Sequence, residues 1–210
     1  MVDWIFSDEF CWKSPNFSDG LNVKAIVVHY SVAPQESPNN AERIKKWCLK
    51  KADRSVHFVV LRDGSVYQSV ALSKKSWHAG ESSWIIDGKK YKYMNNYSIG
   101  IEMDNMGLLR ERDGVICDDY CKRWNGRVCR IGKKIWEPYT FEQFFACKNL
   151  INQLRSMFNL GIDRVLGHND VSPGRKIDPG DAFPWGLIRS NGKTNQWEEL
   201  QKLVPFDEVK

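Results

Sequence analysis

Three side chains in two distant segments have the chemistry and spacing to hold a metal ion. His29 ends the apolar run AIVVH, and His168 and Asp178 both lie in the segment GHNDVSPGRKIDPG. Two neutral imidazoles and one carboxylate suit Zn²⁺ in tetrahedral geometry and leave the fourth position open for water, as in catalytic zinc sites. Such an ion lowers the pKa of its water to about 7 and polarises a carbonyl oxygen. We therefore take these residues as candidate ligands of one zinc ion.

Two further residues are placed to assist such an ion. Lys176 stands two residues before Asp178, so in an extended stretch both side chains leave from the same face. Its ammonium group could stabilise the oxyanion that forms when water attacks an amide. Glu102 ends the strand-like run YSIGIE, where its carboxylate could act as the general base. Glu102 and Lys176 are the candidate catalytic pair.

Each of these residues also has an ordinary structural explanation. A histidine after a buried strand is most often a core or capping residue. Asp178 precedes Pro179 and Gly180, which is by default the composition of a turn. Glu102 could simply pair with a nearby Lys or Arg. Taken one at a time, the residues leave both interpretations open.

The elements that must position these residues alternate between strands and helices. The pattern predicts an α/β fold with a single mixed β-sheet flanked by helices. Asn39 and Asn40 are candidate caps of a first helix, and Thr140 is the candidate cap of a long amphipathic helix. Asp63-Gly64 is the turn of a hairpin. The segments expected as strands are 23–31, the two halves of 57–70, and 97–103.

The remaining segments suggest one catalytic domain, 1–210, with additions at its edge. Its core is expected over about 14–190, preceded by an arm. Residues 73–97 are polar and aromatic and are expected to be loop, and the basic, cysteine-bearing stretch 105–138 is expected to be an edge insertion. A short tail follows at 191–210, with a short helix expected after Asn195.

Composition says little about the chemistry of the protein but limits where it is expected in the cell and which partners it could bind. The net charge of +5 suits a polyanionic partner but is too weak to choose among nucleic acid, an anionic membrane and a teichoic-acid-bearing wall. No nucleic-acid-binding motif is present. No run approaches the roughly 20 apolar residues of a membrane span, so no stable membrane insertion is expected. The sequence has no visible signal peptide, which predicts a protein that is cytoplasmic as synthesised. We expect the six cysteines to be free thiols and the protein to be a monomer.

Several motifs together resemble a known enzyme family. The strings IVVHYS, SVHFVVLRDGSVYQ, SWHAG, NNYSIGIE, EPYT and GHNDVSPGRKIDPG occur in the order typical of the type 2 N-acetylmuramoyl-L-alanine amidases. That family also includes phage lysozyme-like amidases and peptidoglycan recognition proteins. The similarity extends from about Ser14 to Trp185, and the last string is its most specific part. The resemblance implies the peptidoglycan-recognition-like fold.

The resemblance also implies roles for the residues singled out above. His29, His168 and Asp178 would be the zinc ligands, with Glu102 and Lys176 as the catalytic pair. Some relatives carry Tyr where this chain has Val56, which places it with the branch whose glutamate transfers the proton. His57 is expected to be mainly structural. The candidate substrate contacts are Tyr30, Trp77, His78 and Asn95.

The expected substrate is the amide bond between N-acetylmuramic acid and L-alanine in bacterial peptidoglycan. Relatives that recycle small anhydro-muropeptides often carry an Arg before the N-x-S-I-G strand, whereas here the stretch is Tyr93-Met94-Asn95-Asn96. That difference and the 105–138 insertion favour intact wall and a lytic role, as in a phage endolysin released by a separate membrane protein. The alternatives are a cytosolic muropeptide-recycling amidase and a non-catalytic peptidoglycan-binding module. The last usually lacks a zinc ligand, and this chain keeps all three.

Overall fold

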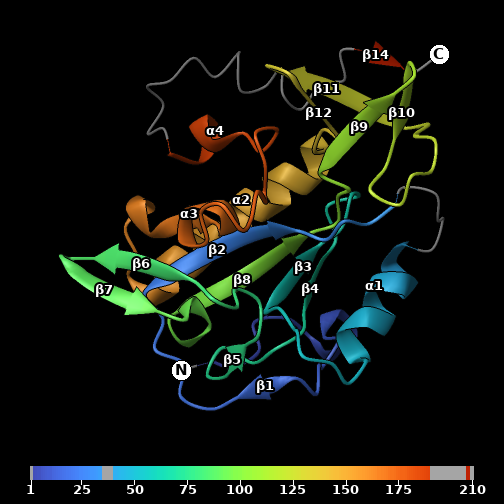
Figure 1. Cartoon of the computed structure of the whole chain (residues 1–210). Coiled ribbons are helices and arrows are strands. Elements are labelled where there is room, and N and C mark those ends of the chain that lie inside the picture. Colours follow the sequence, from blue (N-terminus) through green and yellow to red (C-terminus); the bar gives the residue numbers. More distant parts are fainter. Residues whose placement is uncertain (1, 35–39, 190–206, 209–210) are drawn as a thin grey trace.

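A five-stranded mixed sheet forms the centre of the molecule (Figure 1). The computed structural model describes residues 2–34, 40–189 and 207–208. In the order β13-β2-β8-β3-β4, the first four strands are parallel to their neighbours and β4 is antiparallel to β3. This arrangement confirms the expected fold class. The strands are β13 (Val165–Gly167), β2 (Ala25–Tyr30), β8 (Ser98–Met103), β3 (Phe58–Val60) and β4 (Val66–Gln68).

One face of this sheet is buried under a long helix. Alternate strand residues such as Ile26, Val28 and Ile101 belong to the largest apolar cluster, together with Phe144 and Leu154 of α2 (Phe141–Phe158). Thr140 caps α2 as expected, because its hydroxyl accepts a hydrogen bond from the Gln143 N–H at 3.0 Å. Figure 1 shows α2 running along the back of the sheet. The other face is therefore the one left to carry a site.

That second face is covered only in part. The helix α1 (Asn40–Leu49) packs Ile44 and Cys48 against Val59 of β3, and the short helix α3 (His168–Val171) follows β13. Asn39, one of the two proposed caps of α1, lies outside the described residues. The 73–97 segment packs Ala79 and Met94 against Val27 of β2. Between these covers, the sheet faces a cleft.

Residues 73–97 are more ordered than the sequence predicts. They contain β5 (Lys75–Ser76), the hairpin β6 (Ser83–Ile86) and β7 (Lys89–Lys92), and the 3-10 helix η2 (Met94–Asn96). Asp87 and Gly88 both have positive φ, as a two-residue hairpin turn requires. The prediction of loop was wrong here because both hairpin strands have only four residues and β7 is lysine-rich and mostly exposed, so the segment lacks the alternation that marks a half-buried strand.

The 105–138 segment, called the lobe below, forms a separate antiparallel sheet. Its strands are β9 (Leu108–Arg112), β10 (Val115–Cys117), β11 (Arg127–Ile131) and β12 (Lys134–Trp136), and β14 (Asp207–Glu208) pairs with β11. A small apolar cluster of its own includes Leu109, Trp124 and Val128. The lobe projects from the edge of the molecule beyond the ends of β2 and β8 (Figure 1). The lobe thus lies at an edge of the molecule, and its regular strands are a feature that the sequence pattern missed.

The amino-terminal arm lies over the far edge of the main sheet. Trp12 is buried and stacks on the Tyr67 ring of β4, with ring centroids 3.8 Å apart. No helix in the described ranges is long and apolar enough to cross a membrane, and all six cysteines are free. The remaining elements are η1 (Asp8–Phe10), β1 (Phe17–Ser18), η3 (Ile162–Arg164) and α4 (Trp185–Arg189). The helix expected after Asn195 lies outside the described residues.

Candidate active site

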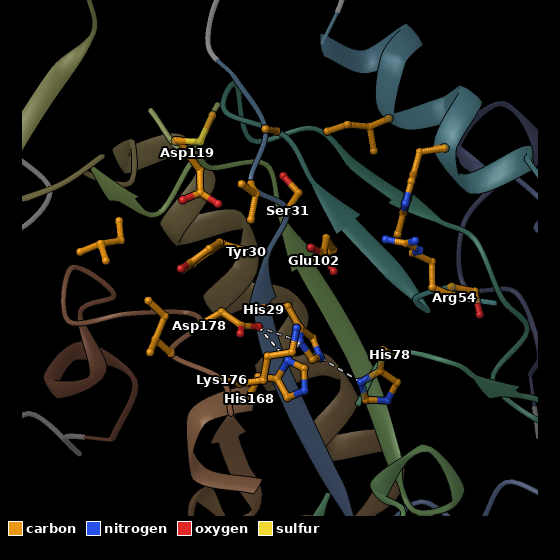
Figure 2. Close-up of a pocket in the computed structure, with 18 of the residues that line it drawn as sticks. His29, Tyr30, Ser31, Arg54, His78, Glu102, Asp119, His168, Lys176 and Asp178 are labelled. Atoms are coloured by element: carbon orange, nitrogen blue, oxygen red, sulfur yellow. Dashed lines mark hydrogen bonds and ion pairs between the residues drawn. The ribbon is translucent and has the colours of Figure 1, made fainter. Parts of the chain in front are cut away.

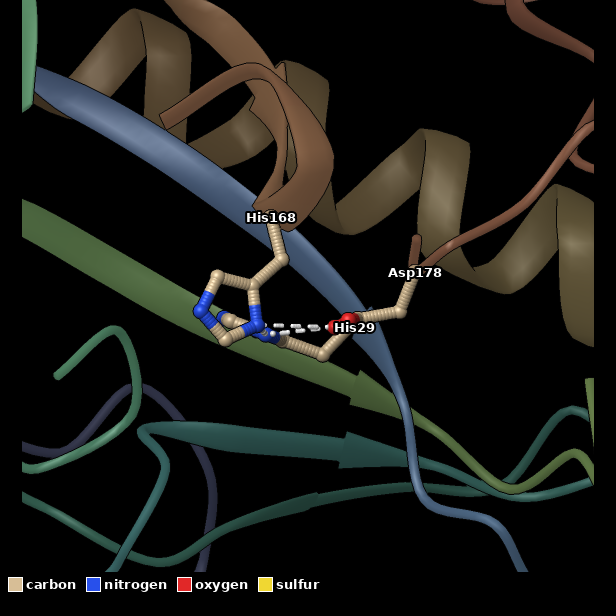
Figure 3. Close-up of side chains that lie close together, drawn as sticks. All are labelled: His29, His168 and Asp178. Atoms are coloured by element: carbon tan, nitrogen blue, oxygen red, sulfur yellow. Dashed lines mark hydrogen bonds and ion pairs between the residues drawn. The ribbon is translucent and has the colours of Figure 1, made fainter. Parts of the chain in front are cut away.

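Three buried polar side chains converge at the carboxyl ends of the parallel strands (Figure 3). The Nδ1 atoms of His29 and His168 lie 2.9 Å apart, and Asp178 Oδ2 lies 3.0 Å from the first and 2.9 Å from the second. Within the described part of the chain, this is the one cluster of His, Cys, Asp or Glu whose ligand atoms could hold a metal ion. The structure thus brings together the three residues that the sequence proposed as ligands.

Different elements fix the three side chains. His29 is the fifth residue of β2 and points to the open face, in phase with Val27. His168 begins α3 directly after β13, where Gly167 leaves room for the ring of Pro179: a Cβ at Gly167 would lie 2.8 Å from Pro179 Cδ. The backbone of the 178–179 segment is held from two sides. Asn169 N–H donates to the Asp178 carbonyl at 2.9 Å, and the Tyr139 hydroxyl donates to the Pro179 carbonyl at 2.7 Å.

Hydrogen bonding alone does not account for this triangle of atoms. A carboxylate only accepts, so both histidines would have to donate to Asp178 from Nδ1. Two N–H groups would then face each other across 2.9 Å. A zinc ion removes the conflict because all three atoms become ligands, and ligand atoms at zinc lie roughly 3.3 Å apart. The residues present therefore fit a zinc ion.

The electrostatics favour an ionised Asp178 carboxylate beside a neutral His29 imidazole. Burial would raise the pKa of Asp178, but the adjacent imidazoles of His168 and His29 outweigh it and hold that pKa well below its usual range. Burial is also the main reason why the pKa of His29 is lowered. A neutral imidazole has a nitrogen lone pair to give to a metal.

Glu102 lies directly beside His29, because the two residues are register partners on the parallel strands β2 and β8. Among the described residues, no hydrogen bond or ion pair holds its carboxylate, which does not support the alternative that it serves only an ion pair. Burial, followed by the negative charge of Asp178, raises the pKa of Glu102 to about 8, and nearby Lys176 opposes the rise. A carboxyl group with such a pKa can exchange a proton near neutral pH.

The cluster opens into a cleft of about 630 Å³ (Figure 2). Glu102 and Lys176 line it together with the three clustered residues, so the structure brings all five into one site. Tyr30, Trp77 and His78, three of the candidate substrate contacts, also line the cleft. Residues that sequence reasoning did not single out complete its walls: Arg43, Trp47 and Arg54 on one side, Asp119 and Tyr120 of the lobe on another, and Arg175 beside His168.

Asn95 and His57 have different surroundings. Asn95 is not among the cleft residues, and its Oδ1 accepts hydrogen bonds from the backbone N–H groups of His78 and Ala79 at 3.0 and 2.6 Å. The fully buried His57 donates from Nε2 to the Lys74 carbonyl at 2.9 Å and accepts at Nδ1 from the Gly100 N–H at 3.0 Å. Both residues therefore stabilise the loops behind the site.

Residues 19–181 match the family described as N-acetylmuramoyl-L-alanine amidase, and this range contains every residue of the cluster and both catalytic candidates. The chain belongs to this family. It is an amidase that acts on the bond between N-acetylmuramic acid and L-alanine in peptidoglycan.

Individual relatives agree with the family. The amidase is 29% identical over 199 residues to the 1,6-anhydro-N-acetylmuramyl-L-alanine amidase AmpD of Haemophilus influenzae, covering 86% of this chain and 90% of the relative. It is 28% identical to the amidase AmiD of Escherichia coli, covering 57% of that longer protein. A solved AmiD complex with anhydro-N-acetylmuramic acid-L-Ala-D-γ-Glu-L-Lys superposes with a TM-score of 0.59 at 25% identity, covering 79% of this chain and 56% of that one. The endolysin LysCS of Clostridium intestinale shares the fold at 20% identity, with a TM-score of 0.51 and coverage of 89% and 91%.

Proposed function

We propose that this amidase is a zinc enzyme whose metal is held by His29, His168 and Asp178, and that it cuts polymeric peptidoglycan in a lytic role. The observation that carries the metal assignment is the buried triangle of two imidazole Nδ1 atoms and one carboxylate oxygen, 2.9–3.0 Å apart. Zinc bound there would supply an activated water and a Lewis acid for the scissile carbonyl.

The protein groups around the cluster have complementary tasks. Glu102, adjacent to His29 and without a competing partner among the described residues, takes the proton of the attacking water and passes it to the departing nitrogen. The Lys176 ammonium lies on the same side of the cleft as Asp178, where it stabilises the negative charge that develops on the carbonyl oxygen (Figure 2). The two roles are separable, because one group moves a proton and the other supplies fixed charge.

The preference for polymeric wall is supported by the shape and lining of the cleft. Lobe residues form part of its wall, so the binding surface extends beyond the reacting bond. Neither Tyr93 nor Asn95 lines the cleft, and no arginine occupies the 93–96 stretch where small-muropeptide relatives often carry one.

A recycling amidase for small anhydro-muropeptides is the second candidate. One observation favours it: the similarity to AmpD covers 90% of the length of that relative, whose name specifies the 1,6-anhydro sugar. The chemistry at the reacting bond is the same for both candidates. They differ only in the size of the substrate that the cleft accepts.

One experiment tests both parts of the proposal. Zinc-loaded protein is incubated with purified sacculi, with and without a chelator, and the soluble products are identified by mass spectrometry. Release of stem peptides with a free N-terminal alanine, blocked by the chelator, supports zinc-dependent cleavage of polymeric wall. Cleavage of soluble anhydro-muropeptides without release from sacculi would replace the lytic role by recycling. Undiminished release in the presence of chelator, from protein shown to be metal-free, would refute the zinc assignment.

A further inference from the structure

The ring of His78 lies behind one of the proposed zinc ligands. His29 Nε2 is 2.9 Å from His78 Nδ1, and the two rings meet edge to face at 82° (Figure 2). On its far side, His78 Nε2 lies 3.3 Å from both the carbonyl oxygen and the hydroxyl oxygen of Ser98. A chain of polar contacts therefore runs from His29 through His78 to Ser98.

The contacts at Ser98 determine which ring nitrogen carries the proton, first in His78 and then in His29. The Ser98 hydroxyl donates to the Met94 carbonyl at 2.6 Å, so both Ser98 oxygens can only accept from His78. His78 must then carry its proton on Nε2 and accept at Nδ1. His29 in turn must donate from Nε2, which leaves the lone pair of its Nδ1 pointing at His168 and Asp178.

His168, the second histidine of the cluster, is oriented by Ala79, the residue that follows His78. His168 Nε2 lies 3.1 Å from the Ala79 carbonyl, which can only accept, and 3.4 Å from Arg175 Nη2, which can only donate. The carbonyl contact is the shorter of the two, and Arg175 has that same carbonyl as an acceptor, so we take Nε2 as protonated and Nδ1 as free. Arg175 donates to the same carbonyl at 2.8 Å and holds it in place. The two consecutive residues His78 and Ala79 thus set the tautomers of both imidazoles.

Asn95 and Gly100 hold His78 and Ala79 in position. The Asn95 side-chain oxygen accepts from both backbone N–H groups, His78 at 3.0 Å and Ala79 at 2.6 Å. Gly100 of β8 provides the space for the His78 ring, because a Cβ there would lie 2.6 Å from His78 Cγ and 2.8 Å from Nδ1. Its φ is not in the left-handed region, so close approach is the reason for glycine.

We propose that His78, Asn95 and Gly100 are positioning residues. They keep the Nδ1 atoms of His29 and His168 unprotonated and pointing at the metal. His78 then acts on zinc binding and not on substrate binding. The inference rests on the proposed ligand set. Partners that orient metal-bound histidines typically contribute 10- to 100-fold to metal affinity.

The test measures zinc affinity by competition with a chromophoric chelator, without substrate. His78→Leu, which removes the acceptor, is expected to weaken zinc binding 10- to 100-fold, whereas His78→Asn keeps an acceptor near the Nδ1 position and restores most of the affinity. Asn95→Ala is expected to weaken binding by about tenfold although Asn95 touches neither ligand. The matched control is Asn96→Ala in the same turn, whose side chain makes no hydrogen bond within the described residues. It should bind zinc as the wild type does.

Two further readouts separate this role from a general loss of structure. In the zinc-loaded wild type, the His29 Nε2–H proton should give a slowly exchanging NMR signal that His78→Leu loses while the His168 signal persists. At saturating zinc, KM should stay unchanged in His78→Leu. Unaltered zinc affinity with a raised KM would overturn the inference and make His78 a substrate contact. A wild type that binds no zinc would instead refute the ligand assignment itself, which is measured first.

Discussion

The main sheet and the lobe contribute to the same cleft in different ways. The proposed ligands and the catalytic pair come from the ends of β2 and β8 and from the segment after β13, where the three ligands are buried and Glu102 and Lys176 are half-buried. The lobe contributes wall residues such as Asp119 and Tyr120, which are largely exposed. Substitutions around the cluster should therefore change metal binding and turnover, whereas those of exposed lobe residues that line the cleft should change substrate affinity alone.

The largest effect is expected at the cluster itself. Asp178→Ala removes the only anionic ligand and leaves two imidazoles, which is too few to hold zinc firmly. We expect loss of the metal and of turnover, measured by metal analysis after dialysis and by release of stem peptides from sacculi. Asp181→Ala is the matched control, because this exposed carboxylate lies in the same loop and, within the described ranges, pairs only with Lys134. A zinc-loaded, active Asp178→Ala protein would show that the ligand set is wrong.

Glu102→Gln should separate proton transfer from metal binding. The amide fills the same space beside His29 but cannot accept the proton of water, so kcat is expected to fall by about 10²-fold or more while zinc stays bound. Glu111→Gln, at an exposed lobe position paired with Arg130, should leave both quantities unchanged. Near-normal kcat in Glu102→Gln would assign the base to another residue.

The sequence predicted the sheet region well because its signals are local. The run AIVVH is continuously apolar, as a strand covered on both faces requires, and its histidine falls on the open face. Thr140 and the periodic apolar residues after it predicted α2 and its cap, and the structure confirms both. The parallel order of β2, β8 and β13 then brings together residues as distant as His29 and His168.

The lobe and the task of Asn95 were not predictable in the same way. The lobe strands are short and carry exposed charges, so their pattern has no clear apolar face, although Asp113-Gly114, both with positive φ, was an available turn signal. Asn95 was expected at the substrate. Its actual partners are two backbone N–H groups more than a dozen residues away, and such long-range pairing leaves no trace in local composition.

A buried ion pair joins the two regions and should be costly to break. Arg62, in the turn after β3, donates to both Glu137 oxygens at 2.7 and 2.9 Å and also pairs with Asp104. Asp104 still balances the Arg62 charge in Glu137→Ala, but two charge-assisted hydrogen bonds in a buried site are lost. This variant is therefore expected to lose about 3–5 kcal/mol of unfolding free energy in urea denaturation. The exposed pair at Glu111 provides the comparison, since Glu111→Ala should cost no more than about 1 kcal/mol. A loss below 1 kcal/mol in Glu137→Ala would mean that the lobe is not anchored through this pair.

Acid should destabilise the sheet region before the lobe, because all four histidines lie outside the lobe. Burial lowers the pKa of His57 from 6.5 to about 4, so between these values the unfolded chain binds a proton that the folded chain does not. Stability is therefore complete above pH 6.5 and falls as the pH drops towards 4, by up to roughly 3 kcal/mol. Amide hydrogen exchange, followed from pH 6.5 down to pH 4, should show that amides of the main sheet lose protection before those of the lobe. Earlier loss in the lobe would contradict this order.

The smallest effect is expected where the lobe meets the substrate. Tyr120 is 58% exposed, lines the cleft, and donates from its hydroxyl to the Val32 carbonyl at 3.2 Å. Because one exposed side chain contributes about 1 kcal/mol, Tyr120→Ala should raise KM for sacculi roughly two- to tenfold and leave kcat and zinc affinity unchanged. Tyr93 is 59% exposed but does not line this cleft, so Tyr93→Ala is a control of equal exposure. A fall in kcat or zinc affinity in Tyr120→Ala would mean that the lobe helps to shape the metal site, and the separation of roles between the two regions would not hold.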